Sequence, residues 1–135
     1  MKITCFEDLE CWKEARNLVK LVYAATRDGH FRRDLRLSGQ IQAAATSAMA
    51  NCAEGFIRHS DKEFTQFLFI AMSSAAEVQS HLYVALDQDY IDESSFRTIY
   101  DQAEKTAMII SGLIKYLRSK QTNRPMRTEQ TKQTK

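Results

Sequence analysis

Proline and glycine are scarce in this chain of 135 residues, which has one proline, Pro125, and four glycines. Both residue types interrupt helices, so their scarcity predicts an all-α protein. Long apolar runs are also missing, because the longest, Phe67 to Met72, is far too short to cross a bilayer. The first residues, MKITCFEDLE, carry charges where a signal peptide needs an apolar region. We therefore expect a single-domain cytoplasmic protein that does not associate with membranes.

Cysteine and histidine are few and poorly spaced for chemistry. The three cysteines lack the two-residue spacing of a metal or redox motif, and Cys52 lies on an apolar helical face, where a thiol serves as a small hydrophobe. A di-iron bundle needs two Glu-x-x-His pairs, whereas the nearest pair here, Glu77 and His81, is four residues apart. No Gly-rich phosphate loop or local nucleophile motif is present. The sequence predicts no enzyme activity, no catalytic residues, no cofactor and no metal.

Apolar residues recur at helical spacing in four stretches that are separated by short connections. Capping residues set the expected bounds. A first helix follows the capping-box pair Thr4 and Glu7 and ends near Asp28 and Gly29, a second begins near Asp34, a third runs from Asp61 to Asp87 behind the pair Ser60 and Glu63, and a fourth follows Asp92. The apolar positions of the fourth helix form a sustained heptad of Phe96, Ile99, Ala103, Thr106, Ile110, Leu113 and Leu117.

Short connections and a heptad together favour an antiparallel, up-down-up-down four-helix bundle. We assign this domain to residues 1–120. Residues 121–135 have no apolar pattern, and they hold four bases against one acid. The sequence predicts that this basic, polar tail is disordered.

The helices carry more apolar side chains than the heptad positions require. The additional residues are Leu18, Leu21, Tyr23, Leu68, Phe69, Met72, Tyr83, Tyr100, Ala107, Ile114 and Tyr116. They either widen the core of a single bundle or form an exposed interface between copies. From the residues alone the two interpretations have equal weight.

A polar stripe runs beside the apolar face of the second helix, where Ser47, Asn51, Glu54 and Arg58 follow one another at steps of four, three and four. It is either a solvated face or a half-buried network. We favour a structural polar network that joins two helices. Its expected members are Asn51, Glu54, Ser74 and Glu77. A buried carboxylate needs a partner, so Glu54 should meet Arg58 or a base of a neighbouring copy.

Basic residues gather in three places that could contact nucleic acid. The candidate contacts are Lys13, Arg16 and Lys20 on the first helix, Arg32, Arg33 and Arg36 at the start of the second, and Arg58 and Lys62 around the following turn. Repetition of modest basic patches in an oligomer would strengthen the field that attracts phosphates. Against this interpretation, Glu10 and Glu14 lie among the bases of the first helix and could pair with them locally.

The segment around the second turn resembles a known bacterial family. The matching residues are Asn51, Ala53, Glu54, Gly55, Phe56, Arg58, Ser60, Lys62, Glu63, Phe64, Ser74 and Glu77. The family comprises four-helix bundle proteins encoded by intervening sequences in 23S ribosomal RNA genes, and the accessory variability determinants of diversity-generating retroelements are related to it. The resemblance implies a ring-shaped homopentamer. It also implies that retroelement relatives bind a reverse transcriptase and its template RNA through a basic surface.

This chain departs from the family pattern on the second helix. Gln42 and Ala43 stand where relatives have two bases, and Ile57 replaces a glycine. We expect a non-enzymatic homopentamer that binds RNA or DNA, with structured RNA as the first choice. The alternative is a scaffold that binds a protein partner, such as a reverse transcriptase, without touching nucleic acid.

Overall fold

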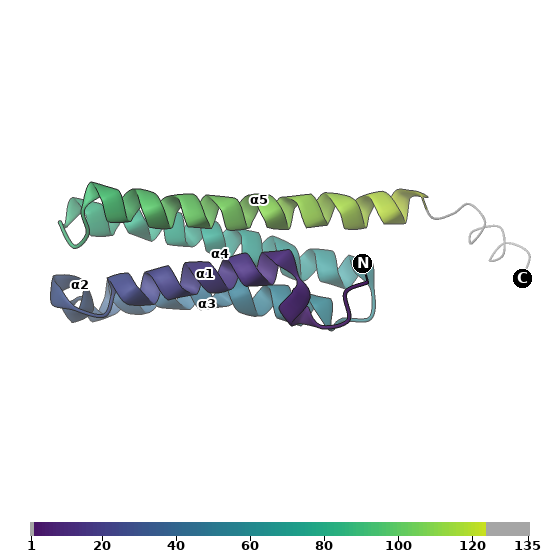
Figure 1. The fold of residues 1–135 in the computed structure, drawn as a ribbon, viewed down its shortest axis with the longest axis horizontal. Helices are drawn as coiled ribbons and strands as arrows, with labels where there is room; N and C mark the ends of the chain where they lie inside the picture. The colour runs from purple at the N-terminus through teal and green to yellow at the C-terminus, as the bar shows by residue number, and fades with distance from the viewer. Residues whose placement is uncertain (1, 124–135) are drawn as a thin grey trace, which may run out of the picture.

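The computed structural model describes residues 2–123, and in these residues all regular structure is helical. The chain forms a 3-10 turn η1 (Phe6–Asp8) and the helices α1 (Glu10–Ala25), α2 (Gly29–Arg33), α3 (Leu35–Phe56), α4 (Asp61–Asp87) and α5 (Glu93–Asn123). Figure 1 shows the four long helices lying side by side. The predicted all-α, up-down-up-down bundle is confirmed. Helix α5 runs three residues past the expected domain end at 120, and the rest of the predicted tail lies outside the described residues.

The long helices follow one another around the bundle in chain order. Helix α1 packs on α3 and α5, while α4 packs on α3 and α5 from the opposite corner. The pair α3 and α4 therefore forms one side of the bundle, and the pair α1 and α5 forms the opposite side. A surface formed by α3 and α4 therefore faces away from a surface formed by α1 and α5.

Three helix starts lie where the capping residues predict them. The Asp34 carboxylate accepts from the Leu37 amide at the start of α3 (3.0 Å), and the Ser60 hydroxyl accepts from the Glu63 amide at the start of α4 (3.1 Å). Asp92 caps α5 in the same way, through the Ser95 amide (2.8 Å). Each bond satisfies an amide that has no partner inside its helix.

The predicted start of the first helix is wrong. Helix α1 begins at Glu10 behind Leu9, which offers no side-chain cap, and the segment around Glu7 forms η1 instead. Packing overrides the capping pattern here, because Phe6 lies edge-on to Trp12 with ring centroids 5.3 Å apart. The sequence reading also missed α2, which is anchored by Phe31, a side chain that is only 1% exposed.

The core continues along the whole bundle in two clusters. The heptad of α5 faces it as predicted, although Leu113 is only partly buried. Three of the additional apolar residues, Leu18, Leu68 and Ile114, are buried in the core and not available to an interface. For these three the interpretation as excess surface is wrong.

Helices α3 and α4 pack tightly against each other at Gly55. A methyl group there would lie 2.8 Å from Cδ1 of Phe64 and 2.9 Å from Cβ of Phe67, which is shorter than normal contact. Glycine is therefore a packing requirement at this position. The close approach brings the polar stripe of α3 against α4.

Candidate nucleic-acid interface

The predicted basic contacts fall into two groups at different places on the bundle. Lys13, Arg16 and Lys20 are exposed on α1, and Arg32, Arg33 and Arg36 are exposed where α1 gives way to α2 and α3. We call Lys13, Arg16 and Lys20 the basic face. Arg58 and Lys62 lie at the other end of α3, whose 22 residues span about 33 Å. The structure therefore separates Arg58 and Lys62 from the other predicted contacts, and it places Arg36 on the outward side of α3, seven residues before Ala43.

Glu14 does not neutralise the basic face, because its side chain turns into the bundle. It is 9% exposed and lies between α1 and α5. The Gln102 side-chain amide donates to Glu14 Oε1 (2.9 Å) and to the Glu14 backbone carbonyl (2.9 Å), and Asn17 and Lys105 complete its surroundings at 3.3 and 3.6 Å. Chiefly through the Gln102 hydrogen bond, these partners hold the pKa of the Glu14 carboxyl below its ordinary value despite its burial. The expected local pairing of Glu14 with α1 bases is wrong.

The bases of α1 are consequently available. Within the described residues, no ion pair engages Lys13, Arg16 or Lys20. Arg16 lies over the Trp12 ring, with its guanidinium carbon 5.7 Å from the centroid. These side chains, with Glu7 and Asn17, line a shallow hollow of about 350 Å³. Exposed cations around an aromatic ring are suited to phosphates and bases of nucleic acid.

Residues 10–36 hold seven Lys and Arg against four Asp and Glu. Asp34, like Glu14, is bonded within the fold: its carboxylate accepts from the Leu37 amide and from the Tyr90 hydroxyl (3.0 Å each). The Leu37 amide, with Tyr90 second, lowers the pKa of Asp34. Both carboxylates stay ionised, but Glu14 has its counter-charge in Lys105 of α5 and leaves the bases of α1 unpaired among the described residues.

The predicted polar network exists only in part. The hydroxyls of Ser47 and Ser74 are hydrogen-bonded across α3 and α4 (2.8 Å), and the Asn51 amide donates to the Ser47 carbonyl and hydroxyl (2.8 and 3.1 Å). Glu54 and Glu77 do not join it. Each turns instead to its own helix.

Glu54 pairs with Arg58 (2.8 Å), one of the two partners that the sequence suggested, and Arg58 also covers the Phe67 ring at 4.7 Å. Glu77 lies 3.2 Å from Nε2 of His81. Both carboxylates are about half exposed, with side-chain exposures of 44% and 55%. Water solvates them, so neither needs a partner on a second helix.

The outward side of α3 and α4 carries almost no charge. Residues 37–53 contain no Asp, Glu, Lys or Arg, and Glu77 is the only such residue between Phe64 and Leu86. The exposed residues on this side are Gly39, Gln40, Ala43 and Ala50 on α3 and Ile70, Ser73, Glu77, Ser80 and Val84 on α4, whereas Phe69 and Tyr83 contact side chains of α5. We call this surface the α3/α4 face. Ile70 is 49% and Val84 44% exposed, so large side chains remain open to solvent.

Other chemistry has little support among residues 2–123. In that part of the chain, no group of three or more His, Cys, Asp and Glu side chains is placed to hold a metal ion. None of the helices described there is both long and apolar enough to span a bilayer. Cys11 and Cys52 are buried together between α1 and α3, and contact with Cys11, followed by burial, raises the pKa of the Cys52 thiol. Cys52 is therefore a core residue, as predicted.

Two polar residues that matter to this surface were missed. Glu14 lies one step from Ala15 and three from Cys11, both buried, so helical spacing alone places it at the edge of the core. Its partner Gln102 precedes the heptad residue Ala103 and could have been found by the same argument. The bond between Tyr90 and Asp34 links residues 56 apart, and no local pattern signals it.

The fold and these surfaces define a four-helix bundle with unpaired bases exposed on α1 and a nearly uncharged surface on α3 and α4. The chain belongs to the 23S rRNA-intervening sequence protein family, whose profile matches residues 7–112. A crystal structure of a protein of unknown function from the S23 ribosomal protein family of Bacteroides thetaiotaomicron VPI-5482 has the same fold. Its TM-score is 0.71 at 22% identity, over 78% of this chain and 95% of that one. No curated protein matches the sequence.

Proposed function

We propose that this protein is a non-catalytic homo-oligomer that binds structured RNA. Copies join through the α3/α4 face, and the basic face of each copy contacts RNA phosphates. The observation that carries the proposal is the separation of charge between the two sides of the bundle. One side lacks almost all charge, and the bases of α1 on the other side have no ion-pair partners within the described residues.

The shape of the α3/α4 face supports assembly between two different strips. The α3 strip has small exposed residues, Gly39, Ala43 and Ala50, whereas the α4 strip has larger ones, including Ile70 and Val84. Large side chains of one copy fit best against the small strip of the next. A heterologous contact closes into a ring when its rotation is one fifth of a turn, which is the geometry that the five copies implied by the family resemblance require.

Mixing two interface variants tests this arrangement. Ala43→Arg blocks the α3 strip and leaves the α4 strip intact. Ile70→Arg blocks the α4 strip and leaves the α3 strip intact. Each variant alone should be monomeric by light scattering, because burying an unpaired arginine costs several kcal/mol. An equal mixture should form a dimer through the one intact pair of strips. A mixture that stays monomeric would contradict the heterologous contact, and single variants that stay oligomeric would contradict the use of this face.

Assembly through the α3/α4 face leaves the basic face on the outside. Helices α1 and α5 lie on the opposite side of the bundle, so every copy would present Lys13, Arg16 and Lys20 outward. Repetition around the ring multiplies the phosphate contacts available to one RNA. The uncharged residue Ala43 on α3 agrees with this outward orientation, because a base there would lie in the contact between copies.

RNA binding is tested by fluorescence anisotropy with a structured RNA hairpin at several salt concentrations. We expect Lys20→Gln to weaken binding and to make the dependence of log K on log salt shallower, since each lost phosphate contact removes roughly 0.7–0.9 from the slope. Lys115→Gln, which removes the same charge from an exposed position on α5, is the matched control. Equal effects of the two variants, or a wild-type affinity independent of salt, would refute phosphate contacts by the basic face.

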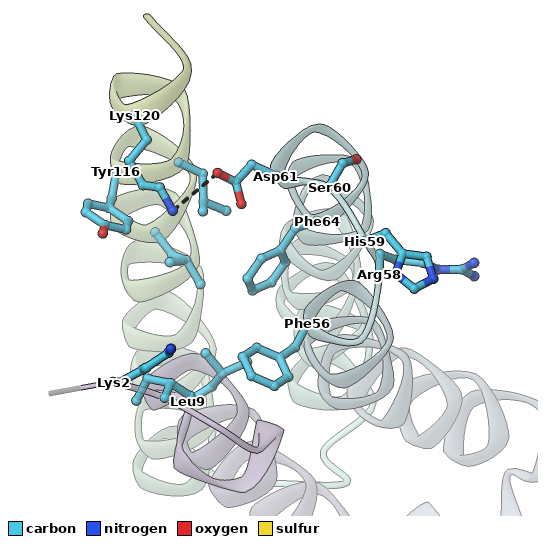
Figure 2. Close-up of a pocket in the computed structure, with 13 residues that line it drawn as sticks. Lys2, Leu9, Phe56, Arg58, His59, Ser60, Asp61, Phe64, Tyr116 and Lys120 are labelled. Atoms are coloured by element: carbon cyan, nitrogen blue, oxygen red, sulfur yellow. Dashed lines mark ion pairs between the residues drawn. The ribbon is translucent and has the colours of Figure 1, made fainter. Parts of the chain in front are cut away.

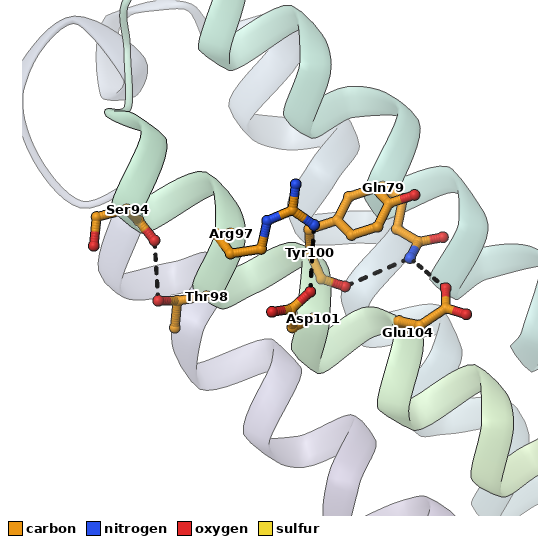
Figure 3. A network of polar contacts seen from close by, with 7 residues as sticks. All are labelled: Gln79, Ser94, Arg97, Thr98, Tyr100, Asp101 and Glu104. Atoms are coloured by element: carbon orange, nitrogen blue, oxygen red, sulfur yellow. Dashed lines mark hydrogen bonds and ion pairs between the residues drawn. The ribbon is translucent and has the colours of Figure 1, made fainter.

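A second candidate function, a scaffold for a protein partner, is favoured by an aromatic cluster on α4 and α5. Tyr83 lies edge-on to Phe96 (5.0 Å) and Tyr100 (6.0 Å), and the Arg97 guanidinium lies over the Tyr100 ring at 5.3 Å. Figure 3 shows the bonds that surround it: Arg97 reaches Asp101 (3.5 Å), and the Gln79 amide reaches Glu104 (3.0 Å) and the Tyr100 carbonyl (3.5 Å). Exposed tyrosine beside arginine is typical of protein interaction hot spots.

The two functions respond to different variants. If the protein is a scaffold, a stoichiometric protein should copurify with the wild type and be lost from Tyr83→Ala, while Lys20→Gln keeps it. If RNA is the ligand, material absorbing near 260 nm should copurify, be lost from Lys20→Gln and remain with Tyr83→Ala. The pattern across the pair of variants therefore decides between the two candidates.

A further inference from the structure

The two ends of the bundle are closed to different extents. At the α2 end, Phe31 is 1% exposed and stacks on Tyr90 with ring centroids 5.4 Å apart, so the core is covered. At the opposite end, Phe56, Phe64 and Leu113 belong to the core but are only partly buried. They surround a cavity of about 550 Å³, within the usual range of small-molecule sites.

Three stretches that are distant in sequence, residues 2–9, 56–64 and 113–120, build this cavity, which we call the end cavity. Its apolar wall consists of Ile3, Leu9, Phe56, Phe64, Leu113 and Leu117. Figure 2 shows the Phe56 and Phe64 rings pointing into the space between α5 and the turn that joins α3 to α4. The two rings lie edge-on, with centroids 6.1 Å apart. An apolar wall of this kind binds the hydrocarbon part of a ligand.

Four basic side chains, Lys2, Arg58, His59 and Lys120, border the end cavity together with the acid Asp61, and their pairing is unequal. Lys120 reaches across to Asp61 (3.3 Å), and Arg58 is paired with Glu54 (2.8 Å). Figure 2 shows Arg58 and His59 pointing away from the cavity. Lys2 lies beside Leu9 at its edge, and no ion pair within the described residues engages its ammonium. The mouth therefore has one cation in excess.

We propose that the end cavity binds an amphipathic carboxylate with a single negative charge. The apolar body of the ligand lies between Phe56 and Phe64, and its carboxylate pairs with Lys2 at the mouth. One excess cation matches one negative charge, while a dianion would also have to displace Asp61 from Lys120. A neutral ligand would gain the apolar contacts but leave Lys2 without a partner.

This site is separate from the proposed RNA contact and does not depend on it. The bases of α1 lie outside the wall of the end cavity, and so does the α3/α4 face. Loss of ligand binding would therefore leave RNA affinity and assembly unchanged. Conversely, Lys20→Gln should bind the ligand as the wild type does.

The test compares naphthaleneacetate with naphthaleneacetamide, which have nearly the same shape but differ by one charge. Calorimetry on the full chain gives the affinities, and backbone amide shifts in NMR spectra give the location. We expect the acid to bind roughly threefold to fivefold more tightly than the amide, the usual effect of an ion pair at a solvent-exposed edge. The shifts should concentrate at Phe56, Phe64 and Leu113.

Two variants and one control complete the experiment. Lys2→Gln should reduce the affinity for the acid to that for the amide, and Leu113→Trp should fill the cavity and abolish both. Lys115→Gln should change neither. Equal affinity of acid and amide in the wild type, or a preference for the acid that survives in Lys2→Gln, would overturn the proposal.

Shifts concentrated on the α3/α4 face would also overturn it, because they would assign the probe to a generic apolar surface. If Leu113→Trp alters the amide shifts of residues 124–135, the end cavity is occupied by the tail of the chain and not by a carboxylate. If Leu113→Trp does not fold, Lys2→Gln alone decides, since it changes an exposed residue.

Discussion

Replacement of Glu14 by Gln should destabilise the bundle in a manner that depends on pH. The carboxylate accepts from Gln102 and Asn17 and lies 3.6 Å from Lys105, while only 9% of the residue is exposed. A hydrogen bond to a charged group contributes about 1.5–3 kcal/mol, and the substituted amide keeps part of this geometry. We therefore expect a loss of about 1–2 kcal/mol at pH 7.

The sign of the pH dependence follows from the pKa of Glu14. Its partners hold this pKa below the ordinary value of about 4.3, so the ionised carboxylate stabilises the folded state at neutral pH. That contribution is complete above pH 4.3 and is lost as the pH falls through the lower, folded-state pKa. The difference in stability between wild type and Glu14→Gln should therefore be constant from pH 6 to 8 and shrink toward pH 3.

Urea denaturation at fixed protein concentration measures this difference, because any assembly adds to the apparent stability. Glu10→Gln is the matched control, since Glu10 is exposed on the same helix and should change stability by less than about 0.5 kcal/mol. Equal losses in the two variants would refute the buried role of Glu14. So would a loss in Glu14→Gln that persists unchanged at pH 3.

Three further predictions concern glycine packing, a turn residue with positive φ and a helix cap. Gly55→Ala should cost about 2 kcal/mol or more, because its methyl group would collide with Phe64. Gly112→Ala on α5 meets nothing within 4 Å and should stabilise the protein by up to about 1 kcal/mol, and urea melts of the pair test both. Asp89 follows the end of α4 and has a φ of 60°, a left-handed conformation that strains any residue except glycine. Asp89→Gly should therefore raise stability by about 0.5–1 kcal/mol in thermal melts, and a decrease in stability would contradict backbone strain at this position. Ser60→Ala should remove the cap of α4 and cost about 1 kcal/mol in the same assay, and an unchanged melting temperature would count against the cap.

The bundle could be predicted because local signals agree with its packing. Ser60 and Asp92 combine a cap with an apolar pattern behind it, and both helices begin where the pattern indicates. Thr4 has the same local spacing without effect, since the contact of Phe6 with Trp12 sets the backbone there. Local chemistry is decisive only where long-range packing supports it.

The candidate site was less accessible to sequence reasoning because it depends on which way each charge faces. Lys13 and Glu14 are neighbours in the chain, yet the first is exposed and the second is bonded to Gln102 on α5. The separation of Arg58 from Arg36 likewise requires the length of α3 as one continuous helix. Charge on a bundle surface becomes interpretable only once the helix rotation is known.

The central claim is that the α3/α4 face joins identical copies, and the molar mass of the full chain in solution tests it most directly. Light scattering at micromolar concentration should give a multiple of the 15.5 kDa chain mass, fivefold for a ring of five copies. Ile70→Arg should return the mass to that of one chain. A wild-type protein with the mass of a single chain would contradict the account.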